Sequence, residues 1–144
     1  MNANPIENAI PHRGPMLLVD EIVECDGDRI VCRKTFREDE FFFQGHYPGY
    51  PLVPGVVLCE CAMQVGGVLL ASKLGDQTAG VPVATRMDQV RFRRMVRPGE
   101  TVEIEVNLRD QVSQAYYLDA RVRCEGKVAA RLEFACTLSE IGGE

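Results

Sequence analysis

An apolar stretch of about twenty residues in the middle of the chain restricts its fold more than any other feature. We expect a helix from Gly55 to about Leu74, where Gly75 would end it. Its side chains are apolar on nearly every side, which is typical of a helix buried all round. The same length could span a bilayer, but Glu60 and Gln64 in its middle favour the core of a soluble domain.

The segments around this helix alternate apolar and polar residues and are separated by short turns, a pattern that indicates antiparallel strands. We expect strands over residues 16–25, 29–36, 81–96, 101–108, 116–124 and 127–138, and a short helix over 5–10 that Asn4 caps. Gly66 and Gly67 predict a point where a strand approaches the helix backbone closely. The expected fold class is α+β, with one domain over residues 1–144 in which an antiparallel sheet folds around one long central helix.

The charge of the chain argues against one class of function. The formal net charge is −5, which does not suit a nucleic-acid binder that works through a broadly basic surface. The charge is uneven, however, because five arginines and one aspartate lie between Arg86 and Arg97. This segment is either a solvated strand face or a basic patch for an acidic partner.

The cysteines and the amino-terminal residues predict the compartment. No basic stretch followed by an apolar one opens the chain, so we expect no signal peptide and a cytoplasmic protein. Six cysteines without a C-x-x-C pair are then best interpreted as reduced thiols packed in the core. With only two histidines available as further ligands, we expect no metal site.

A long irregular run over residues 37–53 leads into the helix and carries His46. A loop of this length inside a compact domain is more often functional than not. Histidine exchanges protons near neutral pH, so His46 suits a general base. Glu60 lies in an apolar helix, where the protonated carboxyl is favoured, and it suits a proton donor. The two residues together predict a general acid–base pair.

Two more residues extend this prediction. Gly55 lies at the helix start, where unpaired N–H groups and the helix dipole stabilise a developing oxyanion. Gln64 follows Glu60 by one helical turn and shares its face. The alternative without catalysis is a buried Glu60 bonded to a neighbouring strand, with His46 bonded to a loop carbonyl.

Three segments carry a specific pattern: IPHRGPMLLVD (10–20), FFFQGHYPGYPLVPGVVLCECAMQVGGVLL (41–70) and DQVRFRRMVRPGETVEIEV (88–106). In order and spacing they resemble the β-hydroxyacyl-[acyl-carrier-protein] dehydratases of type II fatty-acid synthesis, the FabZ family, over nearly the whole chain. The chain departs from the family pattern at Tyr47, Met63 and Arg86, and the resemblance connects these positions with substrate range.

The resemblance implies a hot-dog fold, in which a curved antiparallel sheet wraps a long helix. It implies dehydration of (3R)-hydroxyacyl-ACP to trans-2-enoyl-ACP without metal or organic cofactor. His46 falls on the family's catalytic histidine and Glu60 on its catalytic acid. Gly55 falls on the glycine whose amide binds the thioester carbonyl, and Gln64 on the glutamine that supports the glutamate.

The resemblance also implies partners. The family's sites form across a homodimer, with the histidine from one subunit and the glutamate from the other, and the dimers often assemble as trimers of dimers. Acyl carrier protein (ACP) is acidic, and the candidate docking residues are Arg91, Arg93, Arg94 and Arg97. Neither nucleic acid nor a membrane is expected as a partner.

Two other interpretations remain open at this point. One is a related hot-dog enzyme that acts on another acyl thioester, such as a specialised or polyketide-type dehydratase or a thioesterase. The other is a protein that binds acyl-ACP without turnover. An enoyl thioester, a free thiol or no product at all would distinguish the three.

Overall fold

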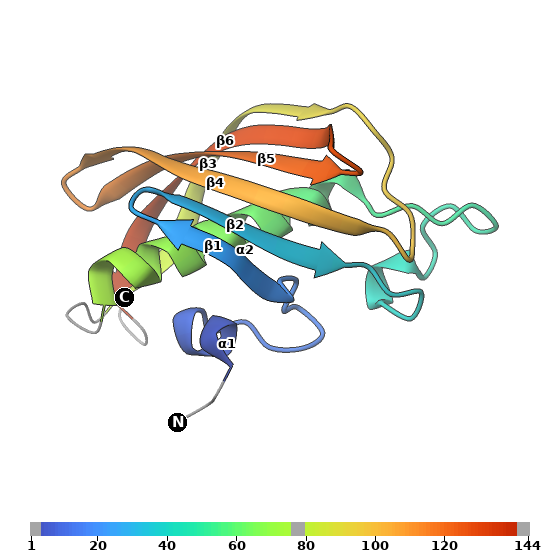
Figure 1. Ribbon diagram of the computed structural model, residues 1–144, viewed down its shortest axis with the longest axis horizontal. Coiled ribbons are helices and arrows are strands. Elements are labelled where there is room, and N and C mark those ends of the chain that lie inside the picture. The colour runs from blue at the N-terminus through green and yellow to red at the C-terminus, as the bar shows by residue number, and fades with distance from the viewer. Residues whose placement is uncertain (1–3, 76–79, 141–144) are drawn as a thin grey trace.

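In the computed structural model, which describes residues 4–75 and 80–140, a curved sheet wraps around one long helix (Figure 1). The described elements in chain order are α1 (Pro5–Ala9), β1 (Glu21–Asp26), β2 (Arg29–Thr35), the 3-10 turn η1 (Phe41–Phe43), α2 (Gly55–Leu74), β3 (Gly80–Phe92), β4 (Thr101–Val112), β5 (Ala115–Cys124) and β6 (Lys127–Glu140). The expected α+β class and the hot-dog arrangement are both confirmed.

The six described strands form one antiparallel sheet in the order β1-β2-β4-β5-β6-β3. The register shows why one face is buried. Ile30, Val106, Ala120 and Leu132 lie side by side across four strands, and each is at most 3% exposed. On β4, β5 and β6 the next residue points to the opposite face and is at least partly exposed, as Asn107, Arg121 and Glu133 show. β1 and β3 are the outer strands of the sheet.

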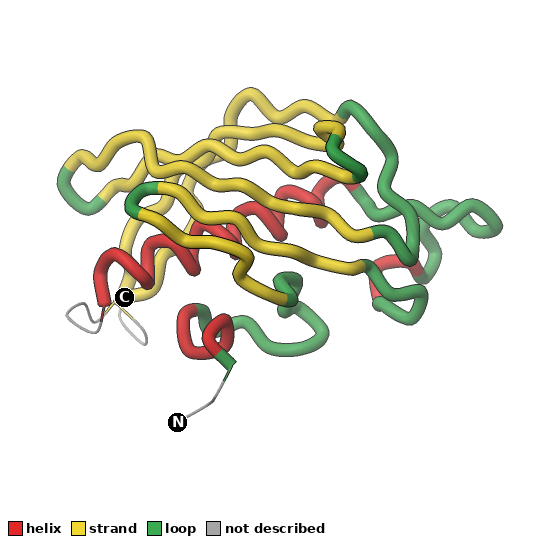
Figure 2. The backbone as a smooth tube through the Cα atoms, in the orientation of Figure 1, coloured by secondary structure: helices red, strands yellow, loops and turns green. Residues whose placement is uncertain are grey.

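Helix α2 lies along the concave face of the sheet, and α1 packs on it from the other side (Figure 2). Two glycines permit this close packing, as the sequence predicted. A Cβ atom at Gly66 would lie 2.7 Å from the ring of Phe134 on β6, and one at Gly67 would lie 3.0 Å from the Ile10 side chain. The Gly67 contact comes from the amino-terminal segment and not from a strand.

The ends of α2 agree with the prediction, since the helix starts at Gly55 and Gly75 caps it with φ 62°. By length and composition alone, with a hydropathy of 1.6, α2 would pass as a membrane-spanning helix. Core helices of soluble proteins pass the same test, and most of α2 is buried under the sheet.

Three predicted strand boundaries were wrong. The first strand was expected to start at Met16, but β1 starts at Glu21, because Met16 and Leu18 bond to the Gln64 side chain of α2 instead of to a strand. The third was expected to reach Val96, but β3 ends at Phe92, and the chain then turns toward the loop before α2. The fourth strand was expected to end at Leu108, but β4 continues to Val112 along β5. The register of β3 against β6 shifts between Asp88 and Arg91.

The cysteines follow the prediction with one exception. Five are buried, whereas Cys25 on β1 is exposed. Burial raises the pKa of the Cys32 thiol to about 12 and that of Cys136 to about 11. Burial also raises the pKa of Cys61 on α2.

Candidate active site

His46 is held by a tight loop that depends on glycine. Gly45 and Gly49 adopt φ values of 78° and 83°, which an L-residue rarely adopts. The ring nitrogen Nδ1 of His46 lies 3.1 Å from the Leu52 carbonyl oxygen. A carbonyl oxygen only accepts, so Nδ1 carries the hydrogen and Nε2 of the neutral ring carries the lone pair. His46 therefore presents a basic nitrogen.

One peptide group connects His46 to a second loop. The Leu52 carbonyl accepts the His46 hydrogen bond, and the adjoining Val53 N–H donates to the Val96 carbonyl at 2.8 Å. Val96 lies in the segment between β3 and β4. The orientation of the imidazole is therefore tied to the position of residues 93–100.

His46 lies in a groove of about 760 Å³ beside the first turn of α2. Apolar side chains provide most of its lining, together with Gly55 at the start of the helix. A Cβ atom at Gly55 would lie 2.7 Å from the Phe92 ring, so any side chain at this position would have to displace that exposed ring. The first N–H groups of α2 have no partner within the helix and can bind an oxyanion here.

Two of the three departures from the family pattern, Tyr47 and Arg86, lie in different surroundings. Tyr47 is exposed at the groove, and its ring centre lies 4.6 Å from that of His46. Arg86 lies on β3 outside the groove and forms an ion pair with Asp88 at 2.6 Å. Arg86 therefore does not crowd His46 within one chain.

Glu60 and Gln64 form a second group on α2. Gln64 is only 1% exposed, and its Nε2 donates to the Met16 carbonyl at 2.7 Å and to Glu60 Oε2 at 2.9 Å. Its Oε1 accepts the Leu18 N–H at 2.8 Å, which fixes the orientation of the amide. Glu60 is half-buried, and its partners are not a strand backbone but Gln64 and His12, whose Nε2 lies 3.5 Å from Oε2.

The two groups face different ways within one chain. Glu60 follows Gly55 by five residues, which is about 140° around the helix and about 7.5 Å along it. Gly55 faces the groove of His46, and Glu60 faces the amino-terminal segment. In the described part of the chain no contact joins His46 to Glu60. One chain thus brings together His46 with Gly55, and Glu60 with Gln64, but not the two pairs.

The four candidate docking arginines divide into two kinds. Arg91 and Arg93 are exposed and have no ion pair with any residue that the structure describes. Arg94 donates to the Cys124 carbonyl at 2.6 Å and to the carboxylates of Glu100 and Glu125. It therefore ties the loop after β3 to the β5–β6 turn.

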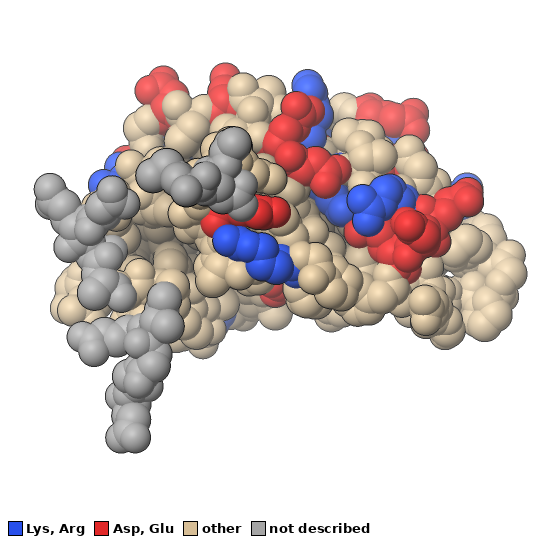
Figure 3. Space-filling view, turned by 90° about the horizontal axis from the view of Figure 1, so that it is seen from below, with Lys and Arg blue, Asp and Glu red and all other residues tan. Residues whose placement is uncertain are grey.

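Arg97 also makes internal contacts, because it hydrogen-bonds the Tyr50 hydroxyl and lies 5.0 Å from the centre of that ring. It joins the loop after β3 to the loop that carries His46. Seen from below, the molecule shows acidic and basic side chains side by side, without a continuous basic area (Figure 3). Of the four arginines, Arg91 and Arg93 are the ones free to meet a partner.

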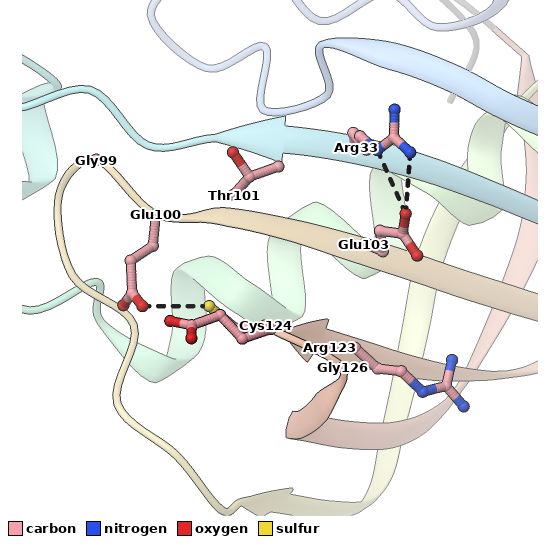
Figure 4. Close-up of a pocket in the computed structure, with 9 residues that line it drawn as sticks. Arg33, Gly99, Glu100, Thr101, Glu103, Arg123, Cys124 and Gly126 are labelled. Carbon is pink, nitrogen blue, oxygen red and sulfur yellow. Dashed lines mark hydrogen bonds and ion pairs between the residues drawn. The ribbon is translucent and has the colours of Figure 1, made fainter.

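The contacts of Arg94 form part of a small acidic cluster. Figure 4 shows the Glu100 carboxylate turned toward the Cys124 thiol, at a distance of 3.5 Å. The hydrogen bond from the Arg97 N–H is the main cause that lowers the pKa of Glu100, and the Cys124 thiol contributes less. Burial is the main cause that raises the pKa of Cys124 to about 11, and its hydrogen bond to Glu100 comes second. Glu100, Cys124 and Glu125 have the chemistry of metal ligands. Arg94 already donates to both carboxylates and supplies the positive charge there.

A buried ion pair supports the start of the His46 loop. Lys34 on β2 is 2% exposed, and its Nζ lies 2.9 Å from Glu40 Oε1. The other Glu40 oxygen accepts the Arg37 N–H at 2.9 Å. Because Glu40 immediately precedes η1, the pair fixes the path of the chain toward His46. Lys34 lies on the same buried face of β2 as Ile30 and Cys32, and its residue type alone gave no signal of this role.

Sequence reasoning also missed His12. Its place as one of only two histidines was the available signal. The structure shows it beside Glu60, on a segment far from α2 in sequence.

Comparison with known proteins places the chain in a family. Residues 10–133 match the FabA-like domain family. The chain is 42% identical over 139 residues to a 3-hydroxyacyl-[acyl-carrier-protein] dehydratase FabZ of Oenococcus oeni, covering 93% of this chain and 98% of that protein. It is 39% identical over 138 residues to the FabZ of Streptococcus pyogenes, covering 94% and 99%.

Solved structures agree on the fold. The dehydratase heterocomplex ApeI:P of Xenorhabdus doucetiae has a TM-score of 0.82 at 18% identity, covering 98% of this chain and 95% of that one. The PaaI protein of Escherichia coli has a TM-score of 0.65 at 18% identity, covering 81% of each. At these identities the likeness concerns the fold alone. The sequence matches go further, and the chain belongs to the FabA-like family, among the FabZ-type 3-hydroxyacyl-[acyl-carrier-protein] dehydratases.

Proposed function

We propose that this protein dehydrates (3R)-hydroxyacyl-ACP to trans-2-enoyl-ACP in fatty-acid synthesis, with His46 as base and Glu60 as acid. Membership of the FabZ-type dehydratases supports the reaction. The observation that supports the base is the His46 ring, whose Nδ1 contact with the Leu52 carbonyl leaves Nε2 with a lone pair at the groove.

The proposed reaction moves two protons and breaks one carbon–oxygen bond. His46 Nε2 takes a proton from the α-carbon, and the electron pair of that C–H bond forms the new double bond to the β-carbon. The bond from the β-carbon to the hydroxyl oxygen breaks, and the Glu60 carboxyl gives its proton to that oxygen, so that water leaves. His46 ends protonated and Glu60 ionised, and proton exchange with solvent restores both.

Two further residues assist this step. The Gly55 N–H would bind the thioester oxygen as negative charge develops during removal of the α-proton. A glycine suits position 55 because any side chain there would contact the Phe92 ring. Gln64 would hold the Glu60 carboxyl in place through its 2.9 Å hydrogen bond, while its other contacts fix the amide to the Met16 and Leu18 backbone.

The active unit that we propose is a homodimer, with His46 of one subunit facing Glu60 of the other. Two observations support this. Within one chain the two residues face different ways. Strand β3 is an outer strand of thirteen residues with exposed apolar side chains such as Val83 and Met87, and a second copy would satisfy its unpaired backbone groups. Assembly of three such dimers into a hexamer is part of the same proposal.

A test of the reaction uses purified protein and (3R)-hydroxyacyl-ACP of several chain lengths, with the enoyl product followed by mass spectrometry. We expect turnover by the wild type and a loss of at least about two orders of magnitude in Glu60→Gln and His46→Ala, each folded. Release of free ACP thiol instead of an enoyl thioester would support a thioesterase. Near-normal turnover in either variant would contradict the assigned roles.

The same two variants test the shared site. If each site takes His46 and Glu60 from different subunits, mixed dimers of the two inactive variants contain one intact site. Random exchange of subunits then restores about a quarter of the wild-type activity. If both residues of a site came from one chain, mixing would restore nothing.

We propose that ACP docks on Arg91 and Arg93 in a cytoplasmic protein that needs no cofactor, while Arg94 and Arg97 hold the groove wall. Reversing the charge at Arg91, which does not line the groove, should raise KM for acyl-ACP several-fold without changing turnover of the same acyl group on N-acetylcysteamine, which has no acidic carrier. An equal effect on both substrates would argue against a docking role.

A further inference from the structure

The contact between His12 and Glu60 assigns different tasks to the two carboxyl oxygens of Glu60. Nε2 of His12 lies 3.5 Å from Glu60 Oε2, and Gln64 Nε2 lies 2.9 Å from the same atom. No hydrogen-bond partner of Oε1 is found in the described part of the chain. All polar neighbours of the carboxyl thus gather at one oxygen.

The segment that carries His12 contacts α2 on both sides of the histidine. Before it, buried Ile10 packs against Gly67. After it, Met16 and Leu18 bond to the Gln64 amide. Residues 10–18 therefore lie along the helix face that carries Glu60, Gln64 and Gly67.

Arg13 fastens the same segment to α1. Its guanidinium donates to the carbonyl oxygens of Glu7 and Ile10 at 3.0 Å and to that of His12 at 2.7 Å. The backbone of His12 is thus held directly. The ring faces Glu60 because the chain on both sides of it is fixed.

The surroundings of the His12 ring define its tautomer. Its Nδ1 is buried and has no hydrogen-bond partner among the described residues. A buried N–H without an acceptor is a rarer defect than an unpaired lone pair, so Nδ1 carries the lone pair. The hydrogen of the neutral ring then lies on Nε2, which faces Glu60 Oε2. A charged imidazolium would place a second, unpaired N–H in the buried position.

Gln64 is also a donor to this oxygen, because its own Oε1 is occupied by the Leu18 N–H. The Gln64 N–H therefore bonds Oε2, and the His12 Nε2–H lies 3.5 Å from the same atom, so a proton on that oxygen would meet both donors. We infer that His12 is a positioning residue that, with Gln64, reserves Glu60 Oε2 as an acceptor and leaves the transferable proton on Oε1. The inference rests on the proposed role of Glu60 as acid. The inference requires this 3.5 Å contact to shorten when substrate binds, as catalytic hydrogen bonds commonly do.

Two amide substitutions separate this role from a structural one. In His12→Gln the side-chain nitrogen can reach the place of the histidine Nε2 and still donate to Glu60. In His12→Asn the shorter amide reaches only the place of Nδ1. We expect His12→Gln to keep kcat within about threefold of the wild type, and His12→Asn to lower kcat about tenfold or more with KM within about twofold.

The controls make each outcome decisive. Unfolding temperatures of both variants show whether they are folded, and His12→Leu serves as a second donor-free variant if His12→Asn is not. Equal kcat values in the glutamine variant and a donor-free variant, whether high or low, would overturn the inference. An inactive wild type, or an active Glu60→Gln, would instead overturn the proposed function, so the two failures are distinguishable.

Discussion

Replacing Gln64 by leucine tests how strongly the amino-terminal segment is held against α2. The change removes three hydrogen bonds and leaves the Leu18 N–H and the Met16 carbonyl without their partner beneath the surface. Each unpaired buried group costs about 1–3 kcal/mol, and burial of the leucine side chain returns about 1–2 kcal/mol. The net loss in the free energy of unfolding is therefore about 3 kcal/mol.

For a domain of this size, about 3 kcal/mol corresponds to a fall in Tm of about 6–12 °C. The measurement is thermal unfolding of the wild type and Gln64→Leu by circular dichroism at one protein concentration, since assembly makes Tm depend on concentration. The neighbouring change Met63→Leu conserves volume and should cost less than about 1.5 kcal/mol. A Tm for Gln64→Leu within about 2 °C of the wild type would refute the reasoning, because the three contacts would then contribute almost nothing.

Three further predictions concern other parts of the molecule. The hydrogen bond from Arg123, and to a smaller extent that from Arg29, lowers the pKa of Glu105 from 4.5 to about 2. The ionised Glu105 carboxylate therefore contributes stability above pH 4.5 that is lost as the pH falls toward 2. Glu105→Gln should therefore cost about 1–2 kcal/mol in urea unfolding at pH 7, a value reduced for partial exposure, and the difference should vanish near pH 2; a difference that does not change with pH would contradict this. In the native protein a thiol reagent should modify Cys25 fast and the five buried thiols slowly, as read by peptide mass spectrometry, and a second fast thiol would be a contrary result. Gly55→Ala should lower kcat at least tenfold with Tm within about 3 °C, because the methyl group meets Phe92 at the groove and not in the core; unchanged turnover would remove Gly55 from the oxyanion site.

The fold could be predicted well from the sequence because its strongest patterns are local. The apolar helix begins at Gly55 and ends before Gly75, and both ends lie where the sequence predicts. The strand boundaries were less predictable, since they depend on distant partners. Met16 and Leu18 read as strand residues, yet the Gln64 side chain takes their backbone groups, and nothing in the local pattern shows that.

For the candidate site, the sequence could predict which residues lie close together along the chain but not the contacts between distant segments. The positions of His46 and Gly55 beside one groove follow from their closeness in sequence. The contact between His12 and Glu60 joins positions 48 residues apart, and no periodic pattern in the sequence predicts it. The internal contacts of Arg94 and Arg97 could not be predicted either. In the sequence, an arginine that bonds within its own chain looks the same as one that binds a partner protein.

The peptide group between Leu52 and Val53 has a consequence for the evolution of substrate range. It holds the His46 ring through its oxygen and the loop before β4 through its nitrogen. Phe92 and Met95, which line the groove, border that loop. Substitutions that widen the groove for bulkier acyl groups should therefore also change the orientation of the His46 ring. We expect broadened variants of this enzyme to be slower on every substrate until a second substitution restores the loop.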